Sequence, residues 1–136
     1  MCVVLNSRIT TRDIDAIFIP KEKIRNLARQ IAIEYNISEN WLNDGVKGFL
    51  SQINGVELFN KLSNLTIYTA TPEYMLAMKC ISCRTTESSD TDDIKVLLHV
   101  LNIRTIEEVE YIIQKYYRLN RVPIRTWYIL EGLLMS

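Results

Sequence analysis

Residues 7–20 read SRITTRDIDAIFIP, and this stretch decides how the sequence is interpreted. Its second half is an apolar run, so residues 13–19 are predicted to form a buried strand that ends at Pro20. Asp13 and Asp15 stand at the head of that strand. Side chains two residues apart point to the same face of a strand, which would place these carboxylates on one face, about 7 Å apart.

Two carboxylates that are buried without partners would each cost several kcal/mol of stability. A divalent cation between them removes that cost, and Mg²⁺ is commonly held by one or two carboxylates together with substrate phosphates. Asp13 and Asp15 are therefore a candidate site for Mg²⁺ or Mn²⁺. The alternative is a strand that begins at a solvent-exposed edge, where both aspartates are simply hydrated.

The composition is that of an ordinary globular protein. The chain has 136 residues, which fits one domain, and 48% of them are hydrophobic and 24% charged. The formal net charge is zero, so no overall basic field favours nonspecific nucleic-acid binding. No apolar run approaches the roughly 18 residues that a membrane span needs, and the first residues lack the charged start of a signal peptide. We therefore expect a cytoplasmic protein with no membrane contact.

The three cysteines and the single histidine are expected to have structural roles. Cys80 and Cys83 form a C-x-x-C pair, but zinc needs four ligands and the sequence holds no second pair. An odd number of cysteines at low density also argues against a disulfide framework. His99 lies in the apolar helical run VLLHVL and has no cysteine partner for nucleophilic chemistry.

The rest of the pattern predicts an α+β fold. Helices are expected at residues 21–36, 73–84, 92–101, 105–117 and 124–135, a short one at 56–62, and a second strand at 65–71. Thr71 can cap the helix that follows it, and TIEE at 105–108 is a capping box. Because the strands come early and the helices late, we predict one small mixed sheet with flanking helices and a helical C-terminal half.

Several segments occur in an order that resembles a known family. RITTRDIDAIF, NWLNDGVKGF, TPEYMLAMKC, Arg84 and DTDDI follow one another along the chain. This pattern resembles nucleotidyltransferase-like domains, in particular a bacterial branch related to the abortive-infection (AbiEii-like) nucleotidyltransferase toxins. The resemblance spans residues 1 to about 117, and it implies the nucleotidyltransferase-like form of the α+β fold.

The resemblance also implies roles for named side chains. Asp13 and Asp15 would hold the metal that bridges the phosphates of a nucleoside triphosphate and aligns an incoming hydroxyl. Lys79, on a helix that is apolar nearly all round, would contact substrate phosphate or assist catalysis. The alternatives for Lys79 are that it snorkels to the surface or pairs with an aspartate of residues 90–93.

Arg8, Arg12 and Asp44 are further candidate site residues, and each has a functional and a structural interpretation. Arg8 and Arg12 flank the metal site and could meet phosphates, although exposed strand-end arginines account for them equally well. The family's third carboxylate usually lies on a later strand, but LTIYTAT carries no acid, so Asp44 in WLNDG is the substitute candidate; otherwise it is a turn aspartate. Arg84 is expected to form a structural ion pair with an aspartate of residues 90–93.

The family's glycine turn has no counterpart in this sequence. That turn precedes the D-x-D by about ten residues and lets backbone amides approach nucleotide phosphates, whereas this chain has Val3 at that distance. Because preorganised donors are often the largest catalytic contribution, we expect poor nucleotide transfer by the chain as it stands.

The resemblance makes a metal-dependent nucleotidyltransferase-type domain the leading expectation. Such a domain moves a nucleotide from a nucleoside triphosphate to an RNA or protein hydroxyl. The alternative from another class is a non-catalytic nucleotidyltransferase-like binding or assembly module, with an antitoxin or a second copy of the chain as partner. A third hypothesis is a plain helical interaction domain in which the D-x-D is hydrated surface.

Overall fold

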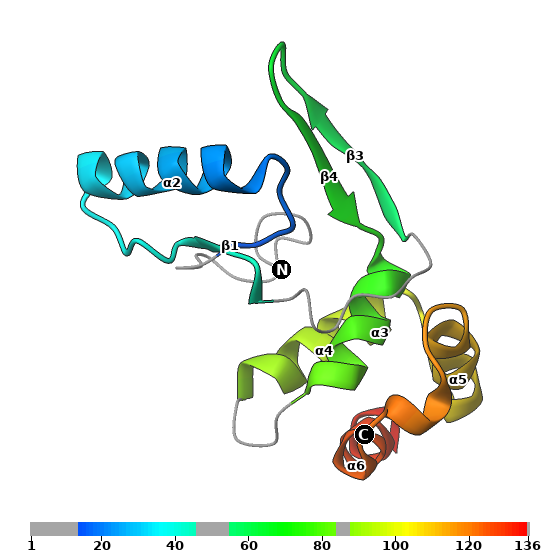
Figure 1. Ribbon diagram of the computed structural model, residues 1–136. Helices are drawn as coiled ribbons and strands as arrows, with labels where there is room; N and C mark the ends of the chain where they lie inside the picture. The colour runs from blue at the N-terminus through cyan, green and yellow to red at the C-terminus, as the bar shows by residue number, and fades with distance from the viewer. Residues whose placement is uncertain (1–13, 46–54, 84–87, 136) are drawn as a thin grey trace. The chain divides into compact units, whose positions relative to one another are not determined.

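The computed structural model describes residues 14–45, 55–83 and 88–135 (Figure 1). By its internal contacts the chain separates into two compact units, Met1–Leu50 and Ser51–Ser136. The described residues form two small sheets and several helices, most of them in the second unit, which confirms the α+β class and the helical C-terminal half. The assignment of the whole chain to one domain stays a prediction.

The described part of the first unit is a parallel β–α–β arrangement. Its elements are β1 (Ile14–Asp15), α2 (Lys21–Tyr35) and β2 (Leu42–Asn43). Asp15 pairs with Asn43 in parallel register, and the Ala16 amide donates a hydrogen bond to the Asn43 carbonyl over 2.9 Å. Parallel strands need a crossover connection, and α2 supplies it. The buried strand predicted at residues 13–19 is wrong in length and in burial over its described part. Only Ile14 and Asp15 pair with the two-residue β2, and Ile17 and Ile19 beyond them are exposed.

The helix α2 begins and ends close to where the sequence predicts. Asn36 ends it in the left-handed conformation, with φ 53°, which asparagine tolerates better than most residues. Its buried face is made of the small residues Ala28 and Ala32. The indole N–H of Trp41 donates a hydrogen bond to the Ala28 carbonyl over 2.9 Å. A tryptophan from the segment before β2 therefore ties that segment to the small-residue face of α2.

The second unit begins with an antiparallel hairpin. β3 (Val56–Lys61) pairs with β4 (Thr66–Ala70), and the register shifts between Leu58 and Asn60. The strand expected at residues 65–71 is confirmed, but the short helix expected at 56–62 is wrong. Six residues are too few for periodicity to decide, and the adjacent strand offers backbone partners that a helix would leave unused. The two sheets are separate in the described residues, which corrects the single mixed sheet.

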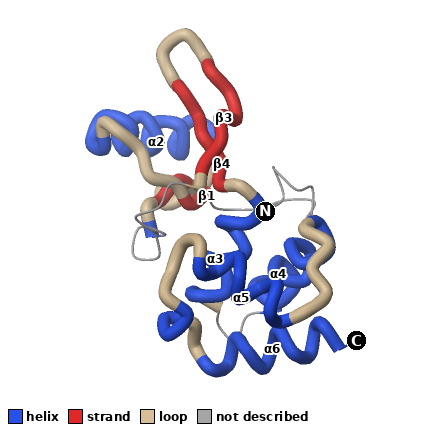
Figure 2. The backbone as a smooth tube through the Cα atoms, turned by 90° about the vertical axis from the view of Figure 1, so that its right-hand side faces the viewer, coloured by secondary structure: helices blue, strands red, loops and turns tan. Residues whose placement is uncertain are grey.

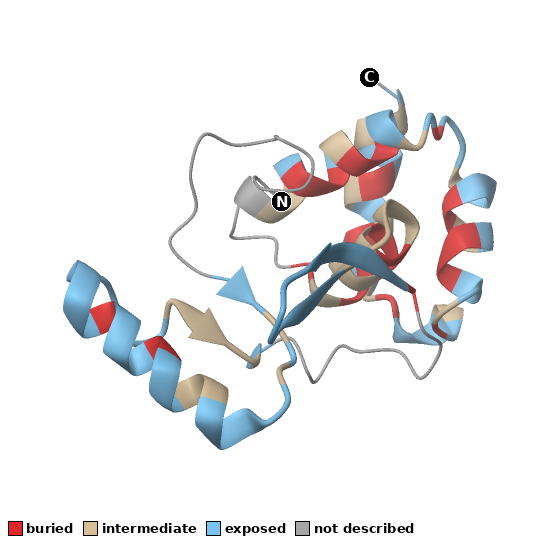
Figure 3. Ribbon diagram, turned by 90° about the horizontal axis from the view of Figure 1, so that it is seen from above, coloured by how far each residue is buried: buried red, intermediate tan, exposed pale blue. Residues whose placement is uncertain are grey.

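Four α-helices and a short 3-10 helix make up the rest of the described chain (Figure 2). They are α3 (Pro72–Ser82), α4 (Ser88–Val100), α5 (Ile106–Gln114), η2 (Leu119–Arg121) and α6 (Ile124–Met135). Figure 3 shows that most of the buried residues lie in these helices. The side chains with no exposed surface are Leu76, Ala77, Cys80, Cys83, Ile94, Leu97, Val109, Ile113, Thr126 and Leu130. The prediction that the first of these helices is buried on most sides is confirmed.

Side-chain caps begin two of these helices where the sequence predicts. The Thr71 hydroxyl accepts a hydrogen bond from the Tyr74 amide over 3.3 Å at the start of α3. At the start of α5, Thr105 and Glu108 form the reciprocal capping box. Each cap satisfies amide groups that have no partner within the helix.

The start of α6 is tied to the end of α3. The Thr126 hydroxyl donates to the Cys80 carbonyl over 2.9 Å, and Nε of Arg125 donates to the Cys83 carbonyl over 3.0 Å. The last carbonyls of a helix have no partner within it, so these two bonds satisfy groups that burial would otherwise penalise.

Gly55 lies where the hairpin approaches α3. Its carbonyl accepts a hydrogen bond from the Thr71 amide over 2.8 Å, and a Cβ at this position would meet Cβ of Tyr74 at 2.7 Å. The Tyr74 ring stacks on Tyr116, with centroids 4.9 Å apart, so it has little freedom to move.

We therefore expect Gly55→Ala to lower the free energy of unfolding by about 1–3 kcal/mol, the usual cost of overpacking. Urea unfolding followed by circular dichroism measures this. Gly132→Ala is the matched control, because a Cβ there meets nothing within 4 Å. Equal stability of Gly55→Ala and the parent would contradict the close approach.

Candidate functional site

The carboxyl edge of β1 and β2 holds the first group of candidate residues. Asp15 is exposed at the end of β1, beside Asn43 at the end of β2. Arg8, Arg12 and Asp13 lie outside the described residues. That Asp13 and Asp15 share a face therefore stays a prediction.

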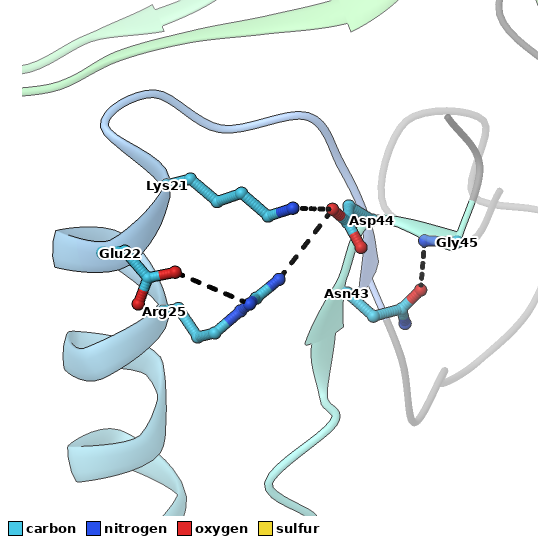
Figure 4. A network of polar contacts seen from close by, with 6 residues as sticks. All are labelled: Lys21, Glu22, Arg25, Asn43, Asp44 and Gly45. Atoms are coloured by element: carbon cyan, nitrogen blue, oxygen red, sulfur yellow. Dashed lines mark hydrogen bonds and ion pairs between the residues drawn. The ribbon is translucent and has the colours of Figure 1, made fainter. Parts of the chain in front are cut away.

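Asp44 follows β2 directly and contacts the first turns of α2 (Figure 4). Its Oδ2 atom lies 3.2 Å from Nζ of Lys21 and 3.9 Å from a guanidinium nitrogen of Arg25. Arg25 also approaches the Glu22 carboxylate, at 3.9 Å. The candidate third carboxylate is thus held by two cations, and neither cation is among the residues that the sequence singled out. The signal that could have found them is their position on the helix that follows the D-x-D strand.

Asn43 supplies a further oxygen at the same edge. Its Oδ1 atom accepts a hydrogen bond from the Gly45 amide over 3.1 Å, which closes a turn after β2 (Figure 4). Because paired residues of parallel strands project to the same face, the Asn43 side chain belongs to the face of Asp15. Carboxylate and amide oxygens are ligands that Mg²⁺ accepts, while Lys21 and Arg25 are groups that bind phosphate.

Lys79 belongs to the second unit, where α3 packs against α4. Its Nζ atom lies 3.0 Å from Oδ1 of Asp90 and 2.9 Å from Oδ2 of Asp93. The side chains of Lys79, Asp90 and Asp93 are 29%, 14% and 3% exposed. Burial alone would lower the pKa of Lys79, but its hydrogen bonds to the two carboxylates outweigh burial and raise it above 10.5.

The pairing of Lys79 with an aspartate of residues 90–93 is therefore confirmed. Asp90 and Asp93 are three residues apart and share a face of α4. A contact between Lys79 and substrate phosphate stays a prediction, as does the ion pair expected of Arg84, which lies outside the described residues.

The two cysteines of the C-x-x-C pair are buried among the helices. Burial raises the pKa of the Cys80 thiol to about 12, with a smaller contribution from the neighbouring Cys83. Burial and the charge of Asp90 also raise the pKa of Cys83. Both thiols are protonated at neutral pH and hence poor nucleophiles, which agrees with their expected structural role. Across the described ranges, no three acidic, cysteine or histidine side chains are grouped so as to hold a metal ion.

Comparison of the chain with protein-family models, with curated proteins and with solved structures finds no match in any of the three. The resemblance to nucleotidyltransferases therefore depends on the sequence pattern, and the function below is a proposal. None of the helices in the described part of the chain is both long and apolar enough to cross a membrane.

Proposed function

We propose that this chain is a nucleotide-binding domain of the nucleotidyltransferase type, which uses Mg²⁺ or Mn²⁺ to bind a nucleoside triphosphate and transfer a nucleotide to an RNA or protein hydroxyl. The observation that supports this most is the position of Asp15 at the carboxyl edge of a parallel strand pair. In open α/β sheets, ligands bind beyond the carboxyl ends of the strands.

The residues at this edge divide into two chemical kinds. Asp15, together with Asp13 from the sequence, supplies carboxylates for the cation, and the Asn43 side chain supplies a neutral oxygen on the face of Asp15. Lys21 and Arg25, at the start of α2, supply positive charge for phosphate oxygens. When no triphosphate is present, those two cations are neutralised by Asp44.

The roles in this proposal follow from the charges. A divalent cation held by Asp13 and Asp15 would neutralise the triphosphate and align the attacking hydroxyl, and these two effects are most of what phosphoryl transfer requires of an enzyme. A triphosphate that reaches Lys21 and Arg25 competes with Asp44 for them, so binding of the nucleotide would release this carboxylate. Asp44 is then available as a third acidic group, as the resemblance implies.

The second candidate is a non-catalytic binding or assembly module with the same fold. It is supported by the two ion-pair clusters, because Asp44 and Lys79 both have partners within the chain. Charged groups that satisfy one another stabilise a fold without taking part in chemistry. An antitoxin or a second copy of this chain would be the partner of such a module.

Calorimetry with each of the four ribonucleoside triphosphates tests the proposal. We expect saturable binding of at least one triphosphate when Mg²⁺ is present, and loss of that binding in EDTA. Incubation with labelled triphosphate and total RNA then separates the two candidates: labelled RNA or protein supports transfer, whereas binding without labelling supports the module. Failure of all four triphosphates to bind would contradict the proposal.

A further inference from the structure

A hollow of about 340 Å³ lies on the second unit, between the end of α4, the loop that follows it and α6. Figure 2 locates these helices in the helical part of the chain. The apolar floor of the hollow is formed by Leu98, Ile103, Leu133 and Leu134. Small-molecule sites occupy roughly 300–1,000 Å³ and combine apolar side chains with a few polar groups, and four of the eight side chains that line this hollow are apolar. The size and floor suit a small ligand with an apolar body.

The rim of the same hollow is basic. Lys95 and His99 lie one turn apart on α4, and Arg104 reaches the hollow from the loop. Within the described residues, no carboxylate lines the hollow. Among the described residues, none of these three side chains forms an ion pair or a side-chain hydrogen bond.

The loop that carries Arg104 is held by its backbone. Asn102 adopts the left-handed conformation with φ 54°, and the Ile103 amide donates to the Leu98 carbonyl over 2.9 Å. The Arg104 amide donates to the Glu108 carboxylate over 2.7 Å. The rim is thus preorganised at the backbone level, which lowers the entropic cost of binding an anion.

We infer that this hollow binds a small, soluble organic phosphate. Its phosphate group would meet Lys95, His99 and Arg104, and its apolar body would cover the leucine and isoleucine floor. The floor distinguishes this ligand from inorganic phosphate, and the basic rim distinguishes it from a neutral apolar molecule. The inference is independent of the proposed function, because the residues that carry it lie outside the first unit.

The single histidine of the chain makes the test direct, because its imidazole proton resonances are assigned without ambiguity. We expect hexyl phosphate to shift these resonances saturably at constant pH 7, with an affinity at least about tenfold above that of inorganic phosphate. Hexanol should leave them in place. No shift up to roughly 10 mM hexyl phosphate, or equal affinity for inorganic phosphate, would overturn the inference.

Charge variants separate a local site from a general charge effect. Lys95→Gln and Arg104→Gln should each weaken hexyl phosphate binding by about tenfold, since each removes a charged donor. Lys61→Gln on the exposed strand β3 changes the net charge equally and should leave the affinity unchanged. An equal loss in all three variants would overturn a specific site. A separate sedimentation experiment uses phosphatidylcholine vesicles that carry phosphatidic acid. If the protein sediments with these vesicles, the hollow binds a lipid headgroup, and the inference of a soluble ligand is overturned.

Discussion

Replacing Lys79 with methionine is expected to lower the free energy of unfolding by about 3 kcal/mol, because it removes an ammonium that pairs with two largely buried carboxylates. The variant keeps the apolar stem of the side chain but removes the ammonium that lies between Asp90 and Asp93. Both carboxylates are largely buried, so water can replace that ammonium only in part. Chemical unfolding at neutral pH, followed by circular dichroism, measures the loss.

The pH dependence of the parent protein follows from the same cluster. The folded state raises the pKa of Lys79 above 10.5. A group whose pKa is raised by folding stabilises the folded state fully below its unfolded value, and that contribution is lost as the pH rises through its folded value. We therefore expect the difference in stability between the parent and Lys79→Met to be constant near neutrality and to shrink above about pH 10.5.

Two controls separate the buried cluster from charge effects in general. In Lys79→Met combined with Asp93→Asn, the buried carboxylate is replaced as well, so most of the lost stability should return. Lys115→Met removes an exposed lysine that pairs with Glu73 at 3.0 Å, and it should change the unfolding midpoint little. If Lys79→Met were as stable as the parent, the lysine would be a surface side chain and the cluster would have no structural importance.

If the proposed function is right, replacing both aspartates of the D-x-D with asparagine will weaken Mn²⁺ binding by at least about tenfold, because the proposal gives the cation these two carboxylates as ligands. Binding of a nucleoside triphosphate in Mg²⁺ should fall with it, since in the proposed site the phosphates would be bound through the cation. Asparagine keeps the size of Asp13 and Asp15 and removes only their charge. Calorimetry and the paramagnetic resonance of free Mn²⁺ measure the two affinities.

The matched control for this double variant is Asp92→Asn combined with Glu107→Gln. Both residues are exposed, on α4 and α5, and their replacement changes the net charge by the same amount. We expect the control to bind Mn²⁺ as the parent does. Unchanged Mn²⁺ binding in the D-x-D variant would place the cation elsewhere and remove the main support for the proposed function.

The local signals of the sequence predicted most helices well. Caps and stops act through backbone groups a few residues away, so Thr71, Thr105 and Asn36 could be identified without any knowledge of the fold. The short strands were harder. The five-residue β4 could be predicted from its pattern, but β2 and β3 could not, and these two exist because a partner strand lies beside each of them.

The candidate site shows the same division between local and distant causes. The D-x-D pattern is visible in the chain, but the contact of Asp44 with Lys21 and Arg25 depends on how β2 returns beside β1. That contact joins residues on either side of α2, so no local rule predicts it. The hollow at the end of α4 is likewise invisible in the sequence, because half of its floor comes from α6.

Lys79 is the clearest example of the division between what the sequence determines and what the tertiary structure decides. The sequence by itself determined that a lysine on a buried helix needs an anion or water, and it limited the nearby anions to a few aspartates. Only the packing of α3 against α4 decided that Asp90 and Asp93 hold it while Asp92 faces solvent. The physical reason is that burial and pairing are properties of facing surfaces, and these surfaces come together only when the helices pack.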